Sequence, residues 1–306
     1  MTVPTVRPLD RGVWGVVATP FHGPSRDVDR TGLARLVQHY ARIGVRGLTV
    51  LGVFGEAARL SHRERRTVLD VVAGTVDLPI VVGATSLATA PLLEETDLLR
   101  EAVGPDRIAG VMVQVNSPRP GTVAQHLRDV HDATGLPLVL QDYPVASGVR
   151  ITAADLVRVV RATPSVAAVK AENPPTPAAV AALTAEVDVP VFGGLGGLGL
   201  LDELAAGSAG AMTGFSCPEG LVACVEAWER SGYAAAREAY LPYLPLVNFE
   251  AQAGIGLALR KEAVRQRGLF PDAAVRPPAQ PLPVALVPQL ARHLAAVPVA
   301  GAEGAD

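Results

Sequence analysis

Lysine is rare in this chain, and one of its two lysines lies where it could act as a nucleophile. Only Lys170 and Lys261 among the 27 basic residues are lysines, so arginine carries nearly every routine positive charge. Arginine stays protonated at any ordinary pH, whereas a desolvated lysine amine can lose its proton and attack a carbonyl. This contrast makes Lys170 a candidate for Schiff-base chemistry.

The residues around Lys170 predict that it ends a buried strand. The segment 165–176 reads SVAAVKAENPPT, and the unbroken run of small and β-branched residues at 166–169 is typical of a strand buried on both faces. The two prolines that follow prevent its continuation. Glu172 lies two residues beyond the lysine, hence on the same face. The alternative is a lysine that snorkels to the surface or pairs with an acid.

The rest of the chain alternates apolar β-like runs with amphipathic helical stretches, which is the pattern of βα repeats and a parallel sheet. Eight strands are predicted, at Val13–Ala18, Gly47–Leu51, Ile80–Gly83, Ile108–Val113, Leu138–Gln141, Val166–Lys170, Val189–Phe192 and Ala209–Thr213. The helices between them are predicted at Thr31–Ile43, Ser61–Gly74, Thr89–Ala102, Thr122–Thr134, Thr152–Arg161, Thr176–Val187, Leu198–Ala206 and Pro218–Glu229. Four of these helices begin at a capping Ser or Thr, and Ser61 has Glu64 at the capping-box position.

Eight such repeats predict a (β/α)8 TIM barrel over residues 1–230. A doubly wound sheet is the rival, but no GxGxxG follows the first strand. Residues 231–306 are expected to form a C-terminal helical extension packed on the barrel, with frayed residues at 300–306. Its helices are predicted at Tyr233–Leu246, Glu250–Arg267 and Val284–Ala295.

The composition of the chain limits the classes of partner that the protein is expected to bind. The net charge is −3 and charged residues are 19%, which excludes the basic field that nucleic acid or an anionic membrane requires. No apolar run has the length of a signal peptide core or a membrane span, so we expect a cytoplasmic protein with a small-molecule partner. Cys217 and Cys224 lack metal-ligand spacing and are expected to be buried thiols. We expect neither a metal nor a cofactor.

The loops after the strands should carry the chemistry, because a barrel of this kind places its active site at the carboxyl ends of its strands. Thr19 follows the first strand, in ATPF. After the second strand, Gly52 and Gly55 could turn backbone N–H groups inward to hold a carboxylate, or could form only a tight turn. Gly193 and Gly194 open a glycine-rich run after the seventh strand, which could bind phosphate or clear space for a substrate.

Four features follow one another along the chain: ATPF, GxxGEAxxLS, a strand that ends in a polar residue and proline, and VKAE. This order resembles the dihydrodipicolinate synthase and N-acetylneuraminate lyase family. The resemblance extends from about Gly12 to Glu229. Such proteins are Schiff-base aldolase barrels and commonly tetramers, so it implies a homo-oligomer, a tetramer or a dimer. It also implies that Lys170 forms a Schiff base with pyruvate or another 2-oxo acid, and that the Gly52–Glu56 turn holds the carboxylate of that acid.

The chain departs from the family pattern at the hydroxyl groups that usually move protons. Val53 and Phe54 replace two hydroxyl residues in the GxxGE turn, and Gln141 replaces a tyrosine at the end of the fifth strand. The synthase's substrate arginine is matched by Ala146. The resemblance therefore predicts neither true dihydrodipicolinate synthase activity nor N-acetylneuraminate cleavage.

Other groups must then move protons. Tyr143 and Glu172 are the candidates closest to Lys170 in the expected strands, with Asp142 as a third. We expect a lyase of the aldolase type that acts on a 2-oxo acid, with Val53 and Phe54 favouring a less hydroxylated or bulkier substrate. The alternatives are a dehydratase of a 2-keto-3-deoxy sugar acid, a barrel that binds a 2-oxo acid without turnover, and a phosphate-binding barrel.

Overall fold

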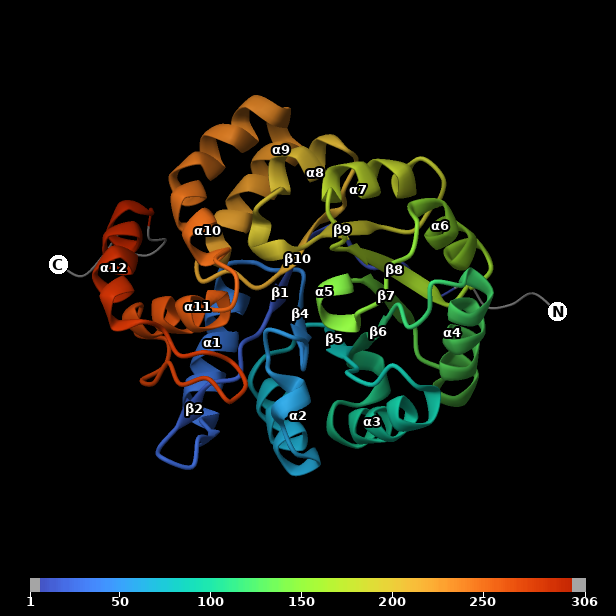
Figure 1. Cartoon of the computed structure of the whole chain (residues 1–306), viewed down its shortest axis with the longest axis horizontal. Helices are drawn as coiled ribbons and strands as arrows, with labels where there is room; N and C mark the ends of the chain where they lie inside the picture. The colour runs from blue at the N-terminus through green and yellow to red at the C-terminus, as the bar shows by residue number, and fades with distance from the viewer. Residues whose placement is uncertain (1–5, 299–306) are drawn as a thin grey trace.

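The computed structural model describes residues 6–298, which form a closed barrel of eight parallel strands enclosed by helices (Figure 1). The strands follow the ring order β1-β10-β9-β8-β7-β6-β5-β4. Their bounds are β1 (Gly12–Val16), β4 (Gly47–Val50), β5 (Ile80–Gly83), β6 (Ile108–Gln114), β7 (Leu138–Asp142), β8 (Val166–Ala171), β9 (Val191–Gly193) and β10 (Gly210–Thr213). The predicted (β/α)8 barrel is confirmed, and every predicted strand forms to within about two residues at each end.

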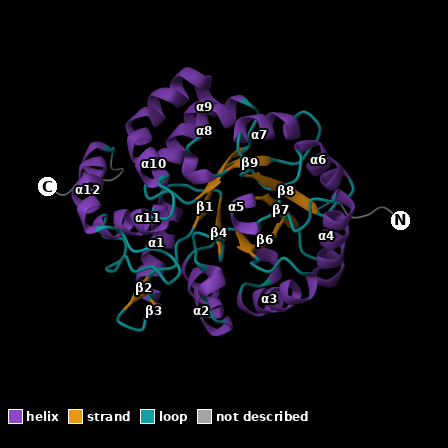
Figure 2. Ribbon diagram, viewed as in Figure 1, coloured by secondary structure: helices purple, strands orange, loops and turns teal. Residues whose placement is uncertain are grey.

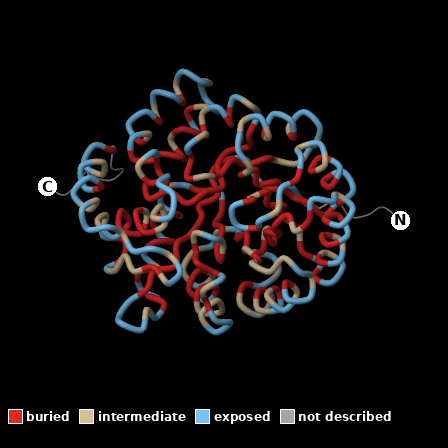
Figure 3. The backbone as a smooth tube through the Cα atoms, in the orientation of Figure 1, coloured by how far each residue is buried: buried red, intermediate tan, exposed pale blue. Residues whose placement is uncertain are grey.

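Side-chain alternation along the strands separates two cores. Trp14, Met112 and Phe192 belong to an inner cluster that fills the barrel, whereas Val169 and Val191 belong to the larger cluster between strands and helices. Figure 3 shows the strands as the most continuously buried part of the chain. The inner cluster closes the barrel, so only its carboxyl-terminal end is free for chemistry.

The helices lie outside the strands in Figure 2. Their bounds are α1 (Arg30–Arg42), α2 (His62–Thr75), α3 (Thr89–Ala102), α4 (Pro120–Thr134), α6 (Ala153–Arg161), α7 (Thr176–Thr184), α8 (Leu200–Ala205) and α9 (Pro218–Tyr240). Helix α9 covers the helix predicted to end at Glu229 and most of the one predicted to begin at Tyr233, and it is kinked between them at Gly232, whose φ of 72° is not helical.

Two of the four predicted caps are confirmed. Ser61 and Glu64 form the reciprocal capping box of α2, and the Thr152 side chain accepts from the Asp155 N–H at the start of α6. The prediction for α1 was wrong, because Asp29 caps it from two residues before Thr31. Thr89 does not cap α3 either, since it is already the first helical residue. In both cases the pattern located the helix but missed its first turn.

The sequence did not predict three short elements. A two-stranded sheet of β2 (Phe21–His22) and β3 (Asp27–Val28) follows β1, and the single turn α5 (Pro144–Ser147) follows β7 and lies over the centre of the barrel in Figure 1. The extension contains α10 (Leu244–Glu250), α11 (Gly256–Gln266) and α12 (Val287–Ala296). Helices α11 and α12 lie near their predicted positions, whereas the helix predicted at Tyr233–Leu246 forms mainly as the end of α9, and α10 begins only at Leu244. The expectation of fraying at 300–306 lies outside the described residues. No helix in the described range has the length and hydropathy to cross a membrane.

Candidate active site

Lys170 and Glu172 meet at the carboxyl end of β8. The Lys170 Nζ lies 3.2 Å from the Glu172 Oε2, and both side chains are less than a tenth exposed. Strand pairing sets Gln141 of β7 beside Lys170, and the Gln141 Nε2 donates to the Glu172 Oε2 at 2.7 Å. The predicted common face of Lys170 and Glu172 is confirmed by their contact. The site therefore holds a buried amine, a carboxylate and an amide that orients the carboxylate.

The glycine run after β9 makes room for this carboxylate. A Cβ on Gly194 would lie 2.2 Å from the Glu172 Oε1, and the Leu195 N–H donates to that same oxygen at 3.3 Å. The next N–H, of Gly196, donates to the Thr213 hydroxyl at 2.7 Å. Because two N–H groups of the run already have partners within the protein, the run clears space here and has less to offer a phosphate.

Gly193 makes room for a second carboxyl group, Glu203, which the sequence analysis missed. A Cβ on Gly193 would overlap the Glu203 Oε2, and the Thr176 hydroxyl donates to the Glu203 Oε1 at 2.5 Å. Glu203 is 1% exposed, and burial raises its pKa to about 7. Two adjacent acids in a short helix, Asp202 and Glu203, give little sign in the sequence of which one is buried. Its proximity to Gly193 emerges only when α8 packs on the sheet.

The turn after β4 is built as a carboxylate-holding loop would be. The Thr19 hydroxyl donates to the Gly55 carbonyl at 2.7 Å, which ties the loop after β1 to this turn. The N–H groups of Val53, Phe54 and Gly55 have no acceptor among residues 6–298. The carboxylate-holding role predicted for Gly52 and Gly55 stays a prediction, which these unpaired N–H groups allow.

The two apolar residues of this turn have different positions. The Phe54 ring packs so closely on Gly214 that a Cβ there would lie 2.4 Å from it, whereas Val53 is 51% exposed. Phe54 therefore helps to line the barrel mouth, by which we mean the loops that follow the carboxyl ends of the strands. The Val53 side chain was predicted to bind substrate, but in this chain it points largely to solvent.

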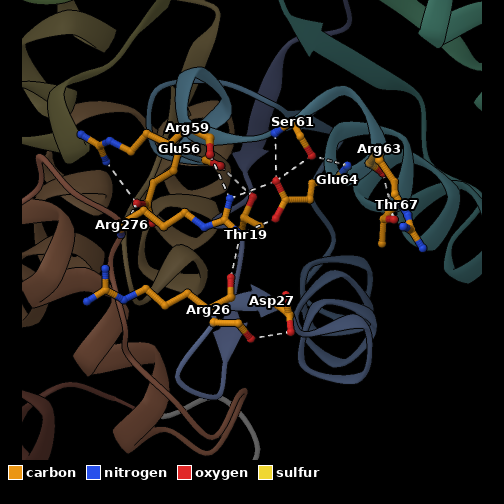
Figure 4. A network of polar contacts seen from close by, with 12 residues as sticks. Thr19, Arg26, Asp27, Glu56, Arg59, Ser61, Arg63, Glu64, Thr67 and Arg276 are labelled. Carbon is orange, nitrogen blue, oxygen red and sulfur yellow. Dashed lines mark hydrogen bonds and ion pairs between the residues drawn. The ribbon is translucent and has the colours of Figure 1, made fainter.

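The second lysine explains the glutamate of the turn. The Lys261 Nζ of α11 donates to the Glu56 Oε1 at 2.8 Å, and both side chains are fully buried. The other Glu56 oxygen accepts from Arg59 at 3.1 Å and from the Arg276 N–H at 2.9 Å, and Figure 4 shows this network continuing to Glu64. Glu56 is thus an anchor between the turn and the C-terminal extension. The rarity of lysine marked Lys261 as well as Lys170, but its role is structural.

Tyr143 lies just past the end of β7, as the N-terminal cap residue of α5, and not in an extended strand. Burial raises the pKa of its phenol, and the nearby Glu172 charge raises it further. It is therefore close to the site, although no described residue hydrogen-bonds its hydroxyl. Asp142 has a pKa raised to about 6 by burial and lies in a polar cluster with Asn173 and Arg150. The structure thus gathers Gln141, Glu172 and Lys170, with Tyr143 beside them.

The sequence was then compared with known proteins. Residues 10–297 match the model of the dihydrodipicolinate synthetase family. The chain belongs to this family. It is 30% identical to the L-2-keto-3-deoxyarabonate dehydratase of Azospirillum brasilense over 90% of each chain. It is 32% identical to the 4-hydroxy-tetrahydrodipicolinate synthase of Kineococcus radiotolerans over 92% of each chain.

Solved structures of the dihydrodipicolinate synthetase family share the fold. A dihydrodipicolinate synthase from Rhodopseudomonas palustris has a TM-score of 0.86 and 28% identity, covering 96% of this chain and 99% of that one. A prophage protein of the family from E. coli K12, solved with pyruvate, has a TM-score of 0.82 and 22% identity, covering 94% of this chain and 99% of that one. The relatives include both a synthase and a dehydratase, so family membership identifies this chain as a lyase and leaves its reaction to be argued from the site.

Proposed function

We propose that this protein is a Schiff-base lyase that acts on a 2-oxo acid through Lys170. The observation that carries the proposal is the buried Lys170–Glu172 contact of 3.2 Å, with Gln141 donating to the same carboxylate. An amine whose partner is a carboxylate can pass it a proton and then attack a carbonyl. The free N–H groups of the turn after β4 would hold the carboxylate of the 2-oxo acid.

The first step is condensation. The Lys170 nitrogen adds to C2 of the substrate, the proton that Glu172 took from the lysine leaves with the C2 oxygen as water, and the product is a protonated imine. Glu172 is then placed to take a proton from C3, because C3 is only two bonds from the imine nitrogen. The electrons of the C3–H bond pass to the imine and give an enamine. The Gln141 amide keeps the carboxylate turned toward the lysine throughout.

The position of Glu172 favours a hydro-lyase. The enamine can expel a hydroxyl group from C4 as a C3–C4 double bond forms, and the proton that Glu172 took from C3 leaves with the hydroxyl as water. Hydrolysis of the imine frees Lys170. The substrate would be a 2-keto-3-deoxy acid, as in the name of the Azospirillum relative. This ranks dehydration above the carbon–carbon cleavage favoured by the sequence.

Carbon–carbon cleavage is the second candidate, supported by the relatives named as synthases. It starts with removal of the C4 hydroxyl proton, which needs a base beyond C3. Tyr143, which follows the end of β7, is the residue of the site that could face that hydroxyl. Product analysis separates the two reactions, because dehydration keeps all carbons in one molecule and cleavage gives two.

Borohydride trapping tests the proposal. The protein with pyruvate and borohydride should gain the mass of one reduced adduct, located at Lys170 by peptide mapping. Lys170→Ala should gain none, whereas Lys261→Arg should still be labelled. A wild-type protein that stays unmodified with pyruvate and with longer 2-oxo acids would reject the Schiff base. Adduct formation without turnover of any 2-keto-3-deoxy acid would favour the non-catalytic 2-oxo-acid-binding barrel.

We also propose that the protein is a cytoplasmic homo-oligomer, a tetramer or a dimer. This proposal is supported by the resemblance of its sequence motifs to a family whose members are commonly tetramers. Light scattering on the purified protein tests the assembly, and a monomeric mass across the working concentration range would exclude it.

A further inference from the structure

Arg260 of α11 reaches the barrel mouth from the C-terminal extension. Its Cζ lies 6.0 Å from the centre of the Phe54 ring, and a Cβ on Gly196 would lie 2.5 Å from its Nη2. Phe54 follows β4 and Gly196 follows β9, so the guanidinium lies against loops at the same end of the barrel as Lys170. The side chain is 18% exposed, which leaves it accessible to a ligand in that region.

A buried carboxylate holds Arg260 by one edge. The Arg260 Nε lies 3.3 Å from the Glu250 Oε2, and the Glu250 side chain is fully buried. Glu250 also accepts from the Ser216 hydroxyl and from the Ser216 N–H. The contact is an ion pair without hydrogen-bond geometry, since the Nε has no hydrogen-bond partner among the described residues, and it draws the guanidinium toward Glu250 without using its terminal nitrogens. Neither Nη atom of Arg260 donates to a residue within 6–298.

The charge of Arg260 acts on the residues that surround the lysine. Burial and Glu172 both raise the pKa of Tyr143, and Arg260 opposes them. Tyr143 follows β7, which lies on the other side of β8 from β9 in the ring. The phenol is thus within the field of both the Glu172 carboxylate and the Arg260 guanidinium. A positioned cation with two unused donor nitrogens therefore lies near the proposed Schiff-base site.

We propose that Arg260 binds a carboxylate at the end of the substrate remote from its 2-oxo acid group. This inference rests on the proposed function, in which the turn after β4 holds the first carboxylate and Lys170 holds C2. The remaining part of the substrate would then extend away from that turn toward the loop that carries Gly196, where the terminal nitrogens of Arg260 are free. Two parallel N–H groups match a carboxylate in a bidentate pair. The substrate class is a 2-oxo acid with a second carboxylate.

Matched pairs of 2-oxo acids test this. The probes are 2-oxoglutarate against 2-oxopentanoate and 2-oxoadipate against 2-oxohexanoate, which differ within each pair in the terminal carboxylate. The readout is the concentration that gives half-maximal borohydride trapping at Lys170. In the wild type at least one dicarboxylate should trap at about tenfold lower concentration than its neutral partner, as a charged hydrogen-bonded pair implies.

Arg260→Gln should bring that ratio close to one, and Arg265→Gln is the control. Arg265 lies on the same helix but pairs with Glu262 away from the mouth, so its loss should leave the ratio as in the wild type. Because Arg260→Gln alone leaves Glu250 buried without its cation, the double variant Arg260→Gln with Glu250→Gln is measured as well. Circular dichroism checks that each variant is folded.

The outcomes separate the two proposals. Pyruvate trapping at Lys170 with no preference for dicarboxylates in the wild type would overturn the role of Arg260 and leave the Schiff base standing. If the folded double variant still prefers the dicarboxylates, the role of Arg260 is likewise overturned and the Schiff base stands. Absence of any adduct, with pyruvate or with the longer acids, would overturn the proposed function and this inference with it.

Discussion

At the residue scale, four carboxyl groups near the barrel mouth have different surroundings and hence different uses. Glu172 lies against an amine, Glu56 is held by a lysine and an arginine, and Glu203 is buried with only a hydroxyl donor. Glu250 is buried against Arg260. Burial raises the pKa of Glu203 to about 7, and burial also raises the pKa of Glu250, although the Arg260 charge opposes that rise. Glu172 alone faces the proposed nucleophile.

Replacing Glu172 by Gln should lower kcat by about a hundredfold or more, because the amide cannot take a proton from C3. The reduced adduct at Lys170 should still form, although more slowly, because the lysine proton must then pass to water instead of to Glu172. Steady-state kinetics and borohydride trapping measure the two effects separately. Glu186→Gln is the control, since Glu186 pairs with Arg161 on the surface. Wild-type turnover by Glu172→Gln would show that another group is the base.

Glu203 should make the free energy of unfolding depend on pH. Its pKa is about 7 when folded and 4.5 in the absence of burial. Between these values the unfolded chain loses the proton and the folded chain keeps it, so this group lowers stability as pH rises from 4.5 to 7, after which the effect is constant. Glu203→Gln removes the effect. Its stability relative to the wild type should therefore increase by up to about 3 kcal/mol between pH 4.5 and 7.5, measured by urea unfolding. A constant difference would contradict the raised pKa.

At the element scale, the loop after β9 shows why a glycine-rich run was hard to interpret from sequence. The run could hold a phosphate or clear space, and both uses need residues without a Cβ. The difference lies in what stands opposite each glycine, namely Glu203 for Gly193 and Glu172 for Gly194. Those carboxylates come from other elements, at positions 172 and 203, so only the packed barrel reveals them.

A methyl group on Gly194 should reduce activity more than stability. The Cβ would lie 2.2 Å from the Glu172 Oε1, so the carboxylate must turn away from Lys170. We expect Gly194→Ala to lose about tenfold or more in kcat, since a small misplacement of a catalytic group is costly. Gly121→Ala is the matched control, because a Cβ there meets nothing within 4 Å. Equal kinetics of the two variants would contradict the assignment.

At the scale of the whole molecule, the C-terminal extension is joined to the barrel mouth by buried charges. Helix α11 contributes Lys261 to Glu56 and Arg260 to the mouth, and the Lys261 Nζ also lies 4.1 Å from the centre of the Phe21 ring. The extension thus supports the turn that is proposed to hold the substrate carboxylate. Removing one member of such a pair leaves the other charge buried and unpaired.

Lys261→Met should lower the free energy of unfolding by about 3–5 kcal/mol, because Glu56 would lose its buried cation. The double change Lys261→Met with Glu56→Gln should cost less than the sum of the single changes. Urea unfolding of the four proteins in this cycle gives the coupling. Additive costs would mean that the pair does not join the extension to the barrel.

The sequence by itself determined the barrel, its strands and Lys170. The barrel, its strands and the strand-end position of Lys170 follow from periodic burial, from turn residues and from a residue type that is rare in the chain, all of which are local signals. The Schiff-base role of Lys170 was implied by the resemblance to the family. Glu172 was found for the same reason, because alternation along a strand is local.

Tertiary structure decided the rest of the site. Gln141 reaches Glu172 because β7 pairs with β8. Glu203 and Arg260 reach the site because α8 and α11 pack on the barrel. Lys261 contacts Glu56, from which it is separated by 205 positions in the sequence. Such contacts depend on how elements far apart in the sequence pack together, and no local pattern records that. The sequence therefore predicted the lysine that is proposed as the nucleophile, and the fold supplied the charged groups that surround it.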